Sequence, residues 1–385
     1  MTPAKVDFVV GTGGIGSGIL FKLIGEHDLG RNETRLAELT DYKDYCKLHI
    51  ILNYVAAFSN GSIPVYAIGA VGDDTIGNEL LELMSKKGID IRYVDIDAQS
   101  GTMYSVCYQY PNGEGGNITT QNSACDKVSQ RHVFRFFNEV KPSKHGIVLS
   151  APEVPVETRL YLLKKGRELG CYNVASLLVG EARQFALHHA FEMIDLLAVN
   201  RDEALAIANL ESETDVETTG ESVVETDYET SDKTDGDTIG ETDCDTTDEN
   251  IADRCYSYLK SKNPDICVIV TCGGEGAYTY HAGQKWFTPA VKNTVRNTAG
   301  AGDCFLGTVI SALIHSLPLT QDVQDDTVSS AVKLALLCGA MKIACNDTID
   351  FSIDKQLLLR FAKSKEIPVS DLVMERFFHS DSKSI

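Results

Sequence analysis

Short apolar runs alternate along the chain with longer segments whose apolar residues recur every three or four positions. The short runs are typical of strands buried on both faces and cover residues 5–10, 65–71, 147–149, 196–199 and 267–271. The segments with helical spacing cover residues 43–58, 75–87, 157–169 and 251–262. Strands that alternate with helices predict an α/β fold with a mainly parallel central sheet flanked by helices on both faces.

A different pattern interrupts this rhythm early in the chain. Residues 102–110 and 117–122 are rich in Thr, Tyr and Val, and they flank the turn sequence Pro111-Asn112-Gly113. Such a pair of segments predicts a β-hairpin. We therefore expect a small β appendage, built from parts of about 12–40 and 100–124, on a main domain that spans residues 1–363. Residues 364–385 are expected to form a C-terminal extension with a peripheral helix.

Residues 211–249 differ from the rest in composition. They contain sixteen Asp or Glu and one Lys, so they contribute −15 to the net charge of −20 and leave an ordinary −5 elsewhere. With almost no large apolar side chains, the segment predicts a disordered acidic insertion. An acidic docking or cation-buffering segment is the alternative. A chain this acidic is not expected to bind nucleic acid, because phosphates would repel it.

No apolar run is long enough to span a membrane, and the first ten residues do not resemble a secretory signal. The eleven cysteines form no C-x-x-C pair, and most lie inside apolar segments. This distribution favours buried free thiols in a reducing compartment over disulfides or a zinc site. We therefore expect a cytoplasmic protein that does not associate with membranes.

The residues that indicate chemistry are the segment 297–303, Asn-Thr-Ala-Gly-Ala-Gly-Asp, and the apolar helical run that follows it. A glycine-rich turn at a helix start presents free backbone N–H groups where the helix dipole is positive, which suits a phosphoryl group. The acid at its end, Asp303, could accept a proton from an attacking hydroxyl. A glycine-rich helix cap with an ordinary first-turn Asp is the simpler alternative.

This heptad resembles the D-T-x-G-A-G-D signature of the ribokinase/PfkB carbohydrate kinase superfamily. Three further segments occur in the family's order and are similar to its motifs: Val71-Gly72-Asp73-Asp74-x-x-Gly77, Asn200-x-x-Glu203 and Val270-Thr271-x-Gly273-x-x-Gly276-Ala277. The resemblance covers about residues 6–363 apart from the acidic insertion. It implies a ribokinase-like fold in which the β appendage is a lid.

The resemblance also implies an activity, phosphoryl transfer from ATP, with Mg²⁺, to a hydroxyl of a small carbohydrate-like substrate. Asp303 would be the catalytic base, and the backbone amides of Ala299, Gly300, Ala301 and Gly302 would form the anion hole. The implied nucleotide-binding residues are Asn200, Glu203, Thr271, Gly273, Gly276, Gly339 and Asn346, with Glu203 reaching Mg²⁺ through water. Candidate substrate-binding residues are Gly14, Gly16, Asp28, Arg31 and Asn53. A homodimer formed through the lid strands is also implied.

The chain departs from the family at three places. The acid expected soon after the first strand is missing, Leu48-His49 replaces a diglycine, and Asn297 replaces the Asp that helps form a monovalent-cation site. A monovalent cation therefore stays open as a cofactor.

A nucleoside kinase of the same fold and a catalytically silent sugar- or nucleotide-binding regulator are alternatives. A dinucleotide enzyme, suggested by Gly11-x-Gly13-x-x-Gly16, is disfavoured because this fingerprint should open a helix.

Overall fold

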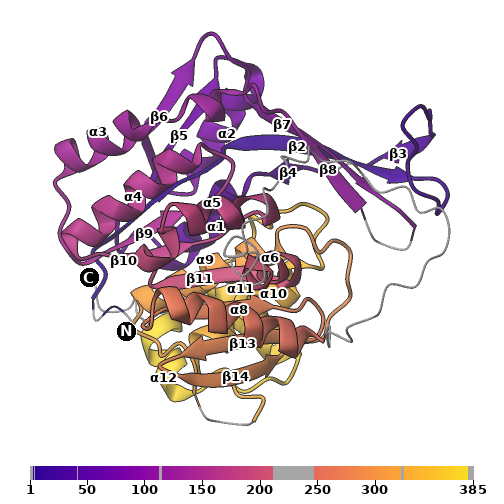
Figure 1. Cartoon of the computed structure of the whole chain (residues 1–385). Coiled ribbons are helices and arrows are strands. Elements are labelled where there is room, and N and C mark those ends of the chain that lie inside the picture. Colours follow the sequence, from indigo (N-terminus) through magenta and orange to yellow (C-terminus); the bar gives the residue numbers. More distant parts are fainter. Residues whose placement is uncertain are drawn as a thin grey trace, which may run out of the picture.

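The computed structural model describes residues 3, 5–40, 42–111, 115–210, 247–321 and 325–379. Within these residues, nine strands form one central sheet (Figure 1). Their order across the sheet is β14 (Gln284–Pro289), β13 (Gly276–His281), β12 (Cys267–Thr271), β11 (Leu196–Asn200), β10 (Tyr172–Ala175), β9 (Gly146–Ser150), β1 (Phe8–Thr12), β5 (Val65–Gly72) and β6 (Ile89–Asp97).

Every pair of neighbours from β12 to β6 is parallel, whereas β13 and β14 add an antiparallel edge. Successive side chains of a strand point to opposite faces, so the apolar strands supply two cores. Val9 and Leu149 pack in one core with α1 (Lys47–Ser59), α9 (Ala301–Ile314) and α10 (Ala331–Lys342). Val10 and Val148 face the opposite way, toward α3 (Gln130–Val140) and α4 (Val156–Leu169). The predicted parallel sheet with helices on both faces is confirmed.

The remaining helices complete these layers. Those in the described residues are α2 (Thr75–Lys86), which contacts β5 and β6, α5 (Ala182–Leu187), α6 (Arg201–Ala208), α8 (Asp248–Lys262), α11 (Lys355–Ser364) and α12 (Asp371–Val373). Most of the predicted insertion, residues 211–246, lies outside the described residues. Asp248 and Glu249, which we expected in the insertion, instead form the first turn of α8, because Thr247 caps that helix through the N–H of Asn250.

A second, smaller sheet projects from one side of the main body and is built from the segments that we expected to form a lid (Figure 1). Its strands run in the order β3 (Ala37–Leu39), β2 (Gly16–Leu23), β7 (Met103–Gln109) and β8 (Gly115–Thr119), and β4 (Asp44–Tyr45) also pairs with β2. β7 and β8 are antiparallel, as the hairpin prediction required, although Asn112 and Gly113 of its turn lie outside the described residues. Because the glycines after β1 lead into strand β2 and not into a helix, the dinucleotide fingerprint has no structural support.

The C-terminal segment is packed more closely than we expected. Val373 of α12 and Phe377 just after it are fully buried in the core that contains α1 and α9. Their burial arises because Phe377 packs on the ring of Phe58 of α1, with ring centroids 5.3 Å apart. The described part of this segment therefore belongs to the main domain. None of the helices in the described ranges is long and apolar enough to cross a membrane, and each described cysteine is a free thiol.

Candidate active site

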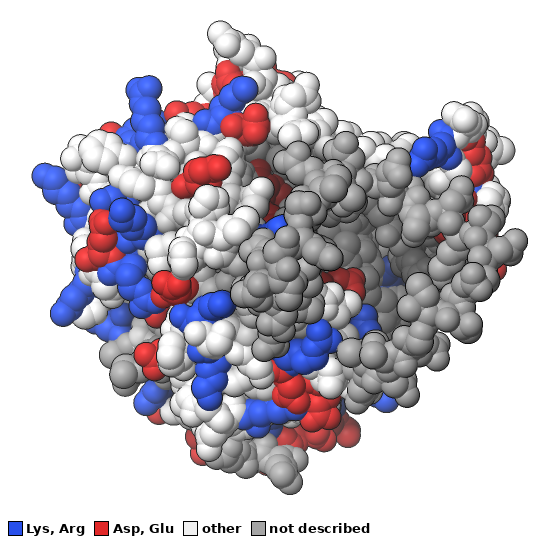
Figure 2. All heavy atoms as spheres, viewed as in Figure 1, with Lys and Arg blue, Asp and Glu red and all other residues white. Residues whose placement is uncertain are grey.

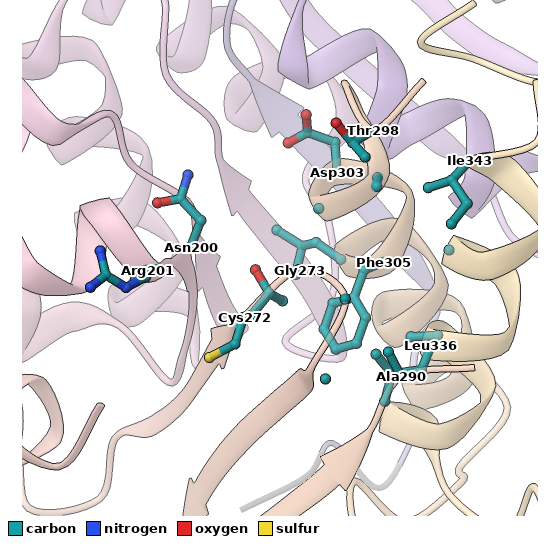
Figure 3. A pocket seen from close by; sticks show the side chains of 18 of the residues that line it. Asn200, Arg201, Cys272, Gly273, Ala290, Thr298, Asp303, Phe305, Leu336 and Ile343 are labelled. Carbon is teal, nitrogen blue, oxygen red and sulfur yellow. The ribbon is translucent and has the colours of Figure 1, made fainter. Parts of the chain in front are cut away.

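A cavity of about 830 Å³ lies at the carboxyl ends of the parallel strands. Its walls come from the β11–α6 junction, the β12–β13 turn, the start of α9 and the side of α10. Figure 3 shows Asn200, Gly273 and Asp303 approaching it from three different elements. This is the place where open α/β sheets bind ligands, since the loops after parallel strands converge there.

The turn before α9 has a shape that only glycine can adopt at one position. Gly300 has φ +74°, and a Cβ atom there would lie 2.6 Å from the carbonyl oxygen of Thr348. The helix begins at Ala301, so Asp303 lies in its first turn and faces the cavity (Figure 3). The glycine turn therefore places a carboxyl group and a helix N-terminus side by side.

The amides available to an anion differ from the four we expected. The N–H of Ala299 donates to Oδ1 of Asn297 (2.9 Å), and that of Ala301 donates to the carbonyl of Thr298 (3.1 Å). Both groups are used inside the turn. Gly300, Gly302 and Asp303 make no such bond within the described part of the chain, so their amides are the ones left for an anion.

The carboxyl group of Asp303 is strongly perturbed. Burial raises its pKa to about 6, the ammonium of Lys47 opposes this rise, and the carboxylates of Glu203 and Asp44 add to it. A carboxyl group with a pKa near neutrality is suited to proton transfer, because it can both accept and release a proton.

Lys47 links two acidic groups near Asp303. Its Nζ donates to Oε1 of Glu203 (3.0 Å), and its backbone N–H donates to Oε2 of Glu153 (3.1 Å). Burial lowers the pKa of Lys47, but the negative charges of Asp303 and Glu203 outweigh burial and raise it above the usual value. The first residue of α1 is therefore a permanent positive charge at the floor of the cavity.

Glu153 follows β9 and completes the acidic group. Its backbone has φ +74°, and its side chain packs against Gly14, where a Cβ atom would lie 2.5 Å from the Glu153 Cβ. Burial raises the pKa of Glu153 to about 7, and the charge of Lys47 opposes the rise. The glycine at position 14 thus leaves the space that this carboxyl group occupies.

The other half of the cavity is lined by most of the residues that we predicted to bind nucleotide. Asn200 caps α6 and Glu203 returns the contact: Oδ1 of Asn200 accepts from the Glu203 amide, and Oε2 of Glu203 accepts from the Asn200 amide, both at 2.9 Å. These residues are both a helix cap and part of the cavity wall. Beyond them lie the predicted turn residues Thr271, Gly273 and Gly276, then the predicted Gly339 and an apolar section formed by Phe305, Leu336, Ala340 and Ile343 (Figure 3).

The family model for pfkB family carbohydrate kinases matches residues 52–230 and 239–356, most of the chain. The chain is a member of the pfkB family. It is therefore an ATP-dependent carbohydrate kinase. The ribokinase of Schizosaccharomyces pombe is 25% identical over 305 residues, which cover 78% of this chain and 83% of that protein.

Solved structures agree with the fold of the kinase. Ribokinase from Cryptococcus neoformans, in complex with ADP, gives a TM-score of 0.66 at 18% identity and covers 93% of this chain and 99% of its own. A protein from Escherichia coli assigned as ribokinase II was solved with ATP and Mg²⁺. It gives a TM-score of 0.66 at 17% identity, and the match covers 93% of this chain and 100% of that protein. The ribokinase-like fold that the heptad implied is confirmed.

Several residues that we predicted for the site of this kinase do not line the cavity. Asn53 is fully buried in the middle of α1. Asn346 acts through its carbonyl, which accepts from Nδ2 of Asn297 at 2.6 Å. Asp28 and Arg31 lie in the loop between β2 and β3, where the Asp28 carbonyl accepts from Arg35 (3.0 Å). Of the residues predicted to bind substrate, only Gly14 is tied to the acidic group, through Glu153, since Gly16 packs against Met103 and Cys46.

The sequence analysis missed three residues around the catalytic cluster of the kinase: Asp44, Lys47 and Glu153. Lys47 is the first residue of α1, which begins four residues after the start of the helical segment predicted at 43–58, and Glu153 follows a correctly predicted strand. Polar residues at the carboxyl ends of parallel strands meet at one edge of a sheet. This rule could have found Glu153, whereas Asp44 lies in the short strand β4, inside the segment 43–58 that we predicted as helical.

Proposed function

We propose that the kinase transfers the γ-phosphoryl group of ATP to a hydroxyl of a sugar, with Asp303 as the catalytic base. One observation carries this proposal. A partly buried carboxyl group lies in the first turn of α9, beside free amides of a glycine turn and inside the cavity that also contains the predicted nucleotide-binding residues. A base next to an anion-binding helix start is what phosphoryl transfer to a hydroxyl requires.

In the proposed reaction, the Asp303 carboxylate accepts the proton of the substrate hydroxyl as its oxygen bonds to the γ-phosphorus. The bond from that phosphorus to the β,γ-bridging oxygen breaks, and ADP leaves with the electron pair. Amides of Gly300, Gly302 and Asp303 donate hydrogen bonds to the charge on the phosphoryl oxygens. Lys47 keeps Asp303 from becoming too basic, because its charge favours the carboxylate form.

Mg²⁺ would be bound mainly by the phosphates of ATP and would supply charge neutralisation. The described residues contain no group of three or more His, Cys, Asp or Glu side chains arranged to hold a metal ion. Both oxygens of Glu203 already accept hydrogen bonds, one from Lys47 and one from the Asn200 amide. Glu203 has lone pairs left for water, so it fits a water-mediated contact to the ion and not direct ligation.

A sugar is favoured over a nucleoside by the groups that surround Asp303. Lys47 carries a positive charge, its backbone N–H donates to the Glu153 carboxyl group, and Asp44 is close enough to raise the pKa of Asp303. Acceptors and donors at this density match a compound with several hydroxyl groups. Glu153 takes the space beside Gly14, so it is our candidate for the acid that the sequence lacks after β1.

The test is ADP release from ATP and Mg²⁺ with a panel of pentoses, hexoses, sugar acids and nucleosides. We expect turnover with at least one free sugar and none without Mg²⁺. Turnover with nucleosides alone would correct the substrate class, and ATP binding without turnover on any hydroxyl compound would favour a silent regulator.

We also propose that the lid is the contact surface of a homodimer. Large apolar side chains on and around the lid sheet are strongly exposed, among them Leu36 at 78%, Ile118 at 65% and Leu39 at 62%. Apolar side chains grouped on one sheet are typical of an interaction surface. Elsewhere on the face shown in Figure 2, acidic and basic side chains are interspersed among the described residues.

Light scattering on the purified protein tests the dimer. We expect a dimer that dissociates in the Leu36→Glu, Leu39→Glu double variant, because two charges would be buried in the contact. Leu187→Glu, which alters another exposed leucine (67%) outside the lid, is the matched control and should stay dimeric. A monomeric parent protein would refute the proposal.

A further inference from the structure

The turn that carries Asp303 is held from behind by a buried lysine. Lys342 is the last residue of α10, and its side chain is inaccessible to solvent. Its Nζ donates to the backbone carbonyl of Asn297 at 3.2 Å and also to the carbonyl of Ala299. A positive charge is therefore fixed on two carbonyl oxygens of the glycine turn.

This contact bears directly on the amide of Asp303. In a continuous helix, the N–H of residue 303 would donate to the carbonyl of Ala299, four residues earlier. The Lys342 ammonium takes that carbonyl, and the turn ends with the Asp303 amide free to meet an anion. Lys342 thus acts on the anion site through the turn and does not itself line the cavity.

The side chain at position 297 agrees with a fixed ammonium. Nδ2 of Asn297 donates to the carbonyl of Asn346 at 2.6 Å, and Oδ1 accepts from the Ala299 amide at 2.9 Å. A carboxylate at this position could not donate to the Asn346 carbonyl and would be repelled by it. With Asn297 and Lys342 in place, the turn contains the positive charge of the lysine ammonium and has no carboxylate at position 297.

A free monovalent cation does not fit this arrangement. Backbone carbonyl oxygens are ligands that K⁺ accepts in place of its water shell, but here two carbonyls of the turn already bind an ammonium group. The acid that would offset the charge of an added cation is replaced by Asn297. Burial lowers the pKa of Lys342, while Asp303 and Asp44 are among the groups that oppose this and favour its charged form.

We propose that the Lys342 ammonium replaces a monovalent cation in fixing the glycine turn, so that this kinase turns over without potassium. Lys342 is then a positioning residue for the anion site. The inference rests on the proposed phosphoryl transfer, yet the two fail differently. An inactive parent protein would count against the proposed function, whereas activity that needs potassium would count against this inference alone.

The first experiment compares turnover of the parent protein in potassium chloride and in tetramethylammonium chloride at equal ionic strength. We expect equal rates, because tetramethylammonium is too large to enter the turn and the lysine makes potassium unnecessary. A tenfold or greater stimulation by potassium, on the order of one charged hydrogen bond, would overturn the proposal.

The second experiment removes the ammonium in Lys342→Ala, with Lys363→Ala as a matched control because Lys363 is exposed on α11. We expect the Lys342 variant to lose about ten- to a hundredfold in kcat in tetramethylammonium. Potassium should restore most of the loss, and more completely when Asn297→Asp is added. A full rate without potassium, or a loss that no monovalent cation restores, would overturn the assignment.

Thermal unfolding gives a readout that does not depend on turnover. Potassium should raise the midpoint of the Lys342→Ala, Asn297→Asp variant relative to tetramethylammonium, because the ion binds the folded turn. It should leave the midpoints of the parent protein and of Lys363→Ala unchanged. A potassium-dependent midpoint in the parent protein would contradict a built-in cation.

Discussion

Replacing Asp303, the proposed catalytic base, should stabilise the folded protein while it strongly lowers turnover. In Asp303→Asn, the side chain keeps its shape but loses the buried charge. The shift of the Asp303 pKa from 3.8 to about 6 corresponds to about 3 kcal/mol of destabilisation at pH 7.5, from 1.4 kcal/mol for each pKa unit.

The sign follows from proton linkage. A carboxyl group whose pKa is raised in the folded state binds more protons when folded, so it costs stability as the pH rises from about 4 to about 6. The gain in Asp303→Asn should therefore be largest at pH 7.5, should fall to about half at pH 5, and should vanish at still lower pH. Loss of the partner charge for Lys47 reduces the gain, so we expect about 1 to 3 kcal/mol.

Urea unfolding of both proteins at pH 7.5 and pH 5 measures this difference. Asp326→Asn is the control, since Asp326 is exposed and its replacement should change stability little at either pH. A variant that is less stable than the parent protein at pH 7.5, or a gain that is the same at both pH values, would refute the reasoning.

Three further changes test the surroundings of Asp303. In the pH profile of kcat/KM, the acidic limb should lie between pH 6 and 7, because the Asp303–Glu153 pair titrates there. Lys47→Met should move this limb upward by about one pH unit. An unmoved limb would show that Lys47 does not set its position. Gly300→Ala should lose stability by at least about 1 to 2 kcal/mol in thermal unfolding, because its φ is +74° and the Thr348 carbonyl blocks a Cβ; a neutral effect would mean that the turn can shift. Arg159→Met should cost about 3 to 5 kcal/mol in urea unfolding, since it leaves the Glu181 carboxylate, 2.6 Å from the guanidinium, without its partner; a stable variant would show that water compensates.

The main sheet could be predicted because its strands are buried on both faces. Runs such as 196–199 and 267–271 consist of apolar residues, and the structure places strands β11 and β12 there. The strands β3 and β4 of the smaller sheet were not predicted, and the prediction of a helix over 43–58 was wrong at residues 44–45, which form β4. They contain three and two residues, too few for an alternation to be visible, and pairing with β2 determines them.

The proposed nucleotide half of the site consists of turns whose shape depends on local sequence, so the sequence could indicate the residues that line it. Gly300 needs a positive φ, and Asn200 and Glu203 cap the same helix three residues apart. The substrate half depends on contacts between distant segments. Lys47 and Glu153 are joined across 106 residues, and Lys342 reaches Ala299 across 43. No local pattern contains such contacts, so the sequence analysis did not find Lys47 and Glu153.

The most direct test of the central claim is the rate of phosphoryl transfer in Asp303→Asn, measured with the sugar that the panel identifies and with ATP and Mg²⁺ at saturation. We predict a fall in kcat of about two to four orders of magnitude with ATP binding retained, because the variant keeps the glycine turn and loses only the base. A variant that turns over at the rate of the parent protein would show that Asp303 is not the base.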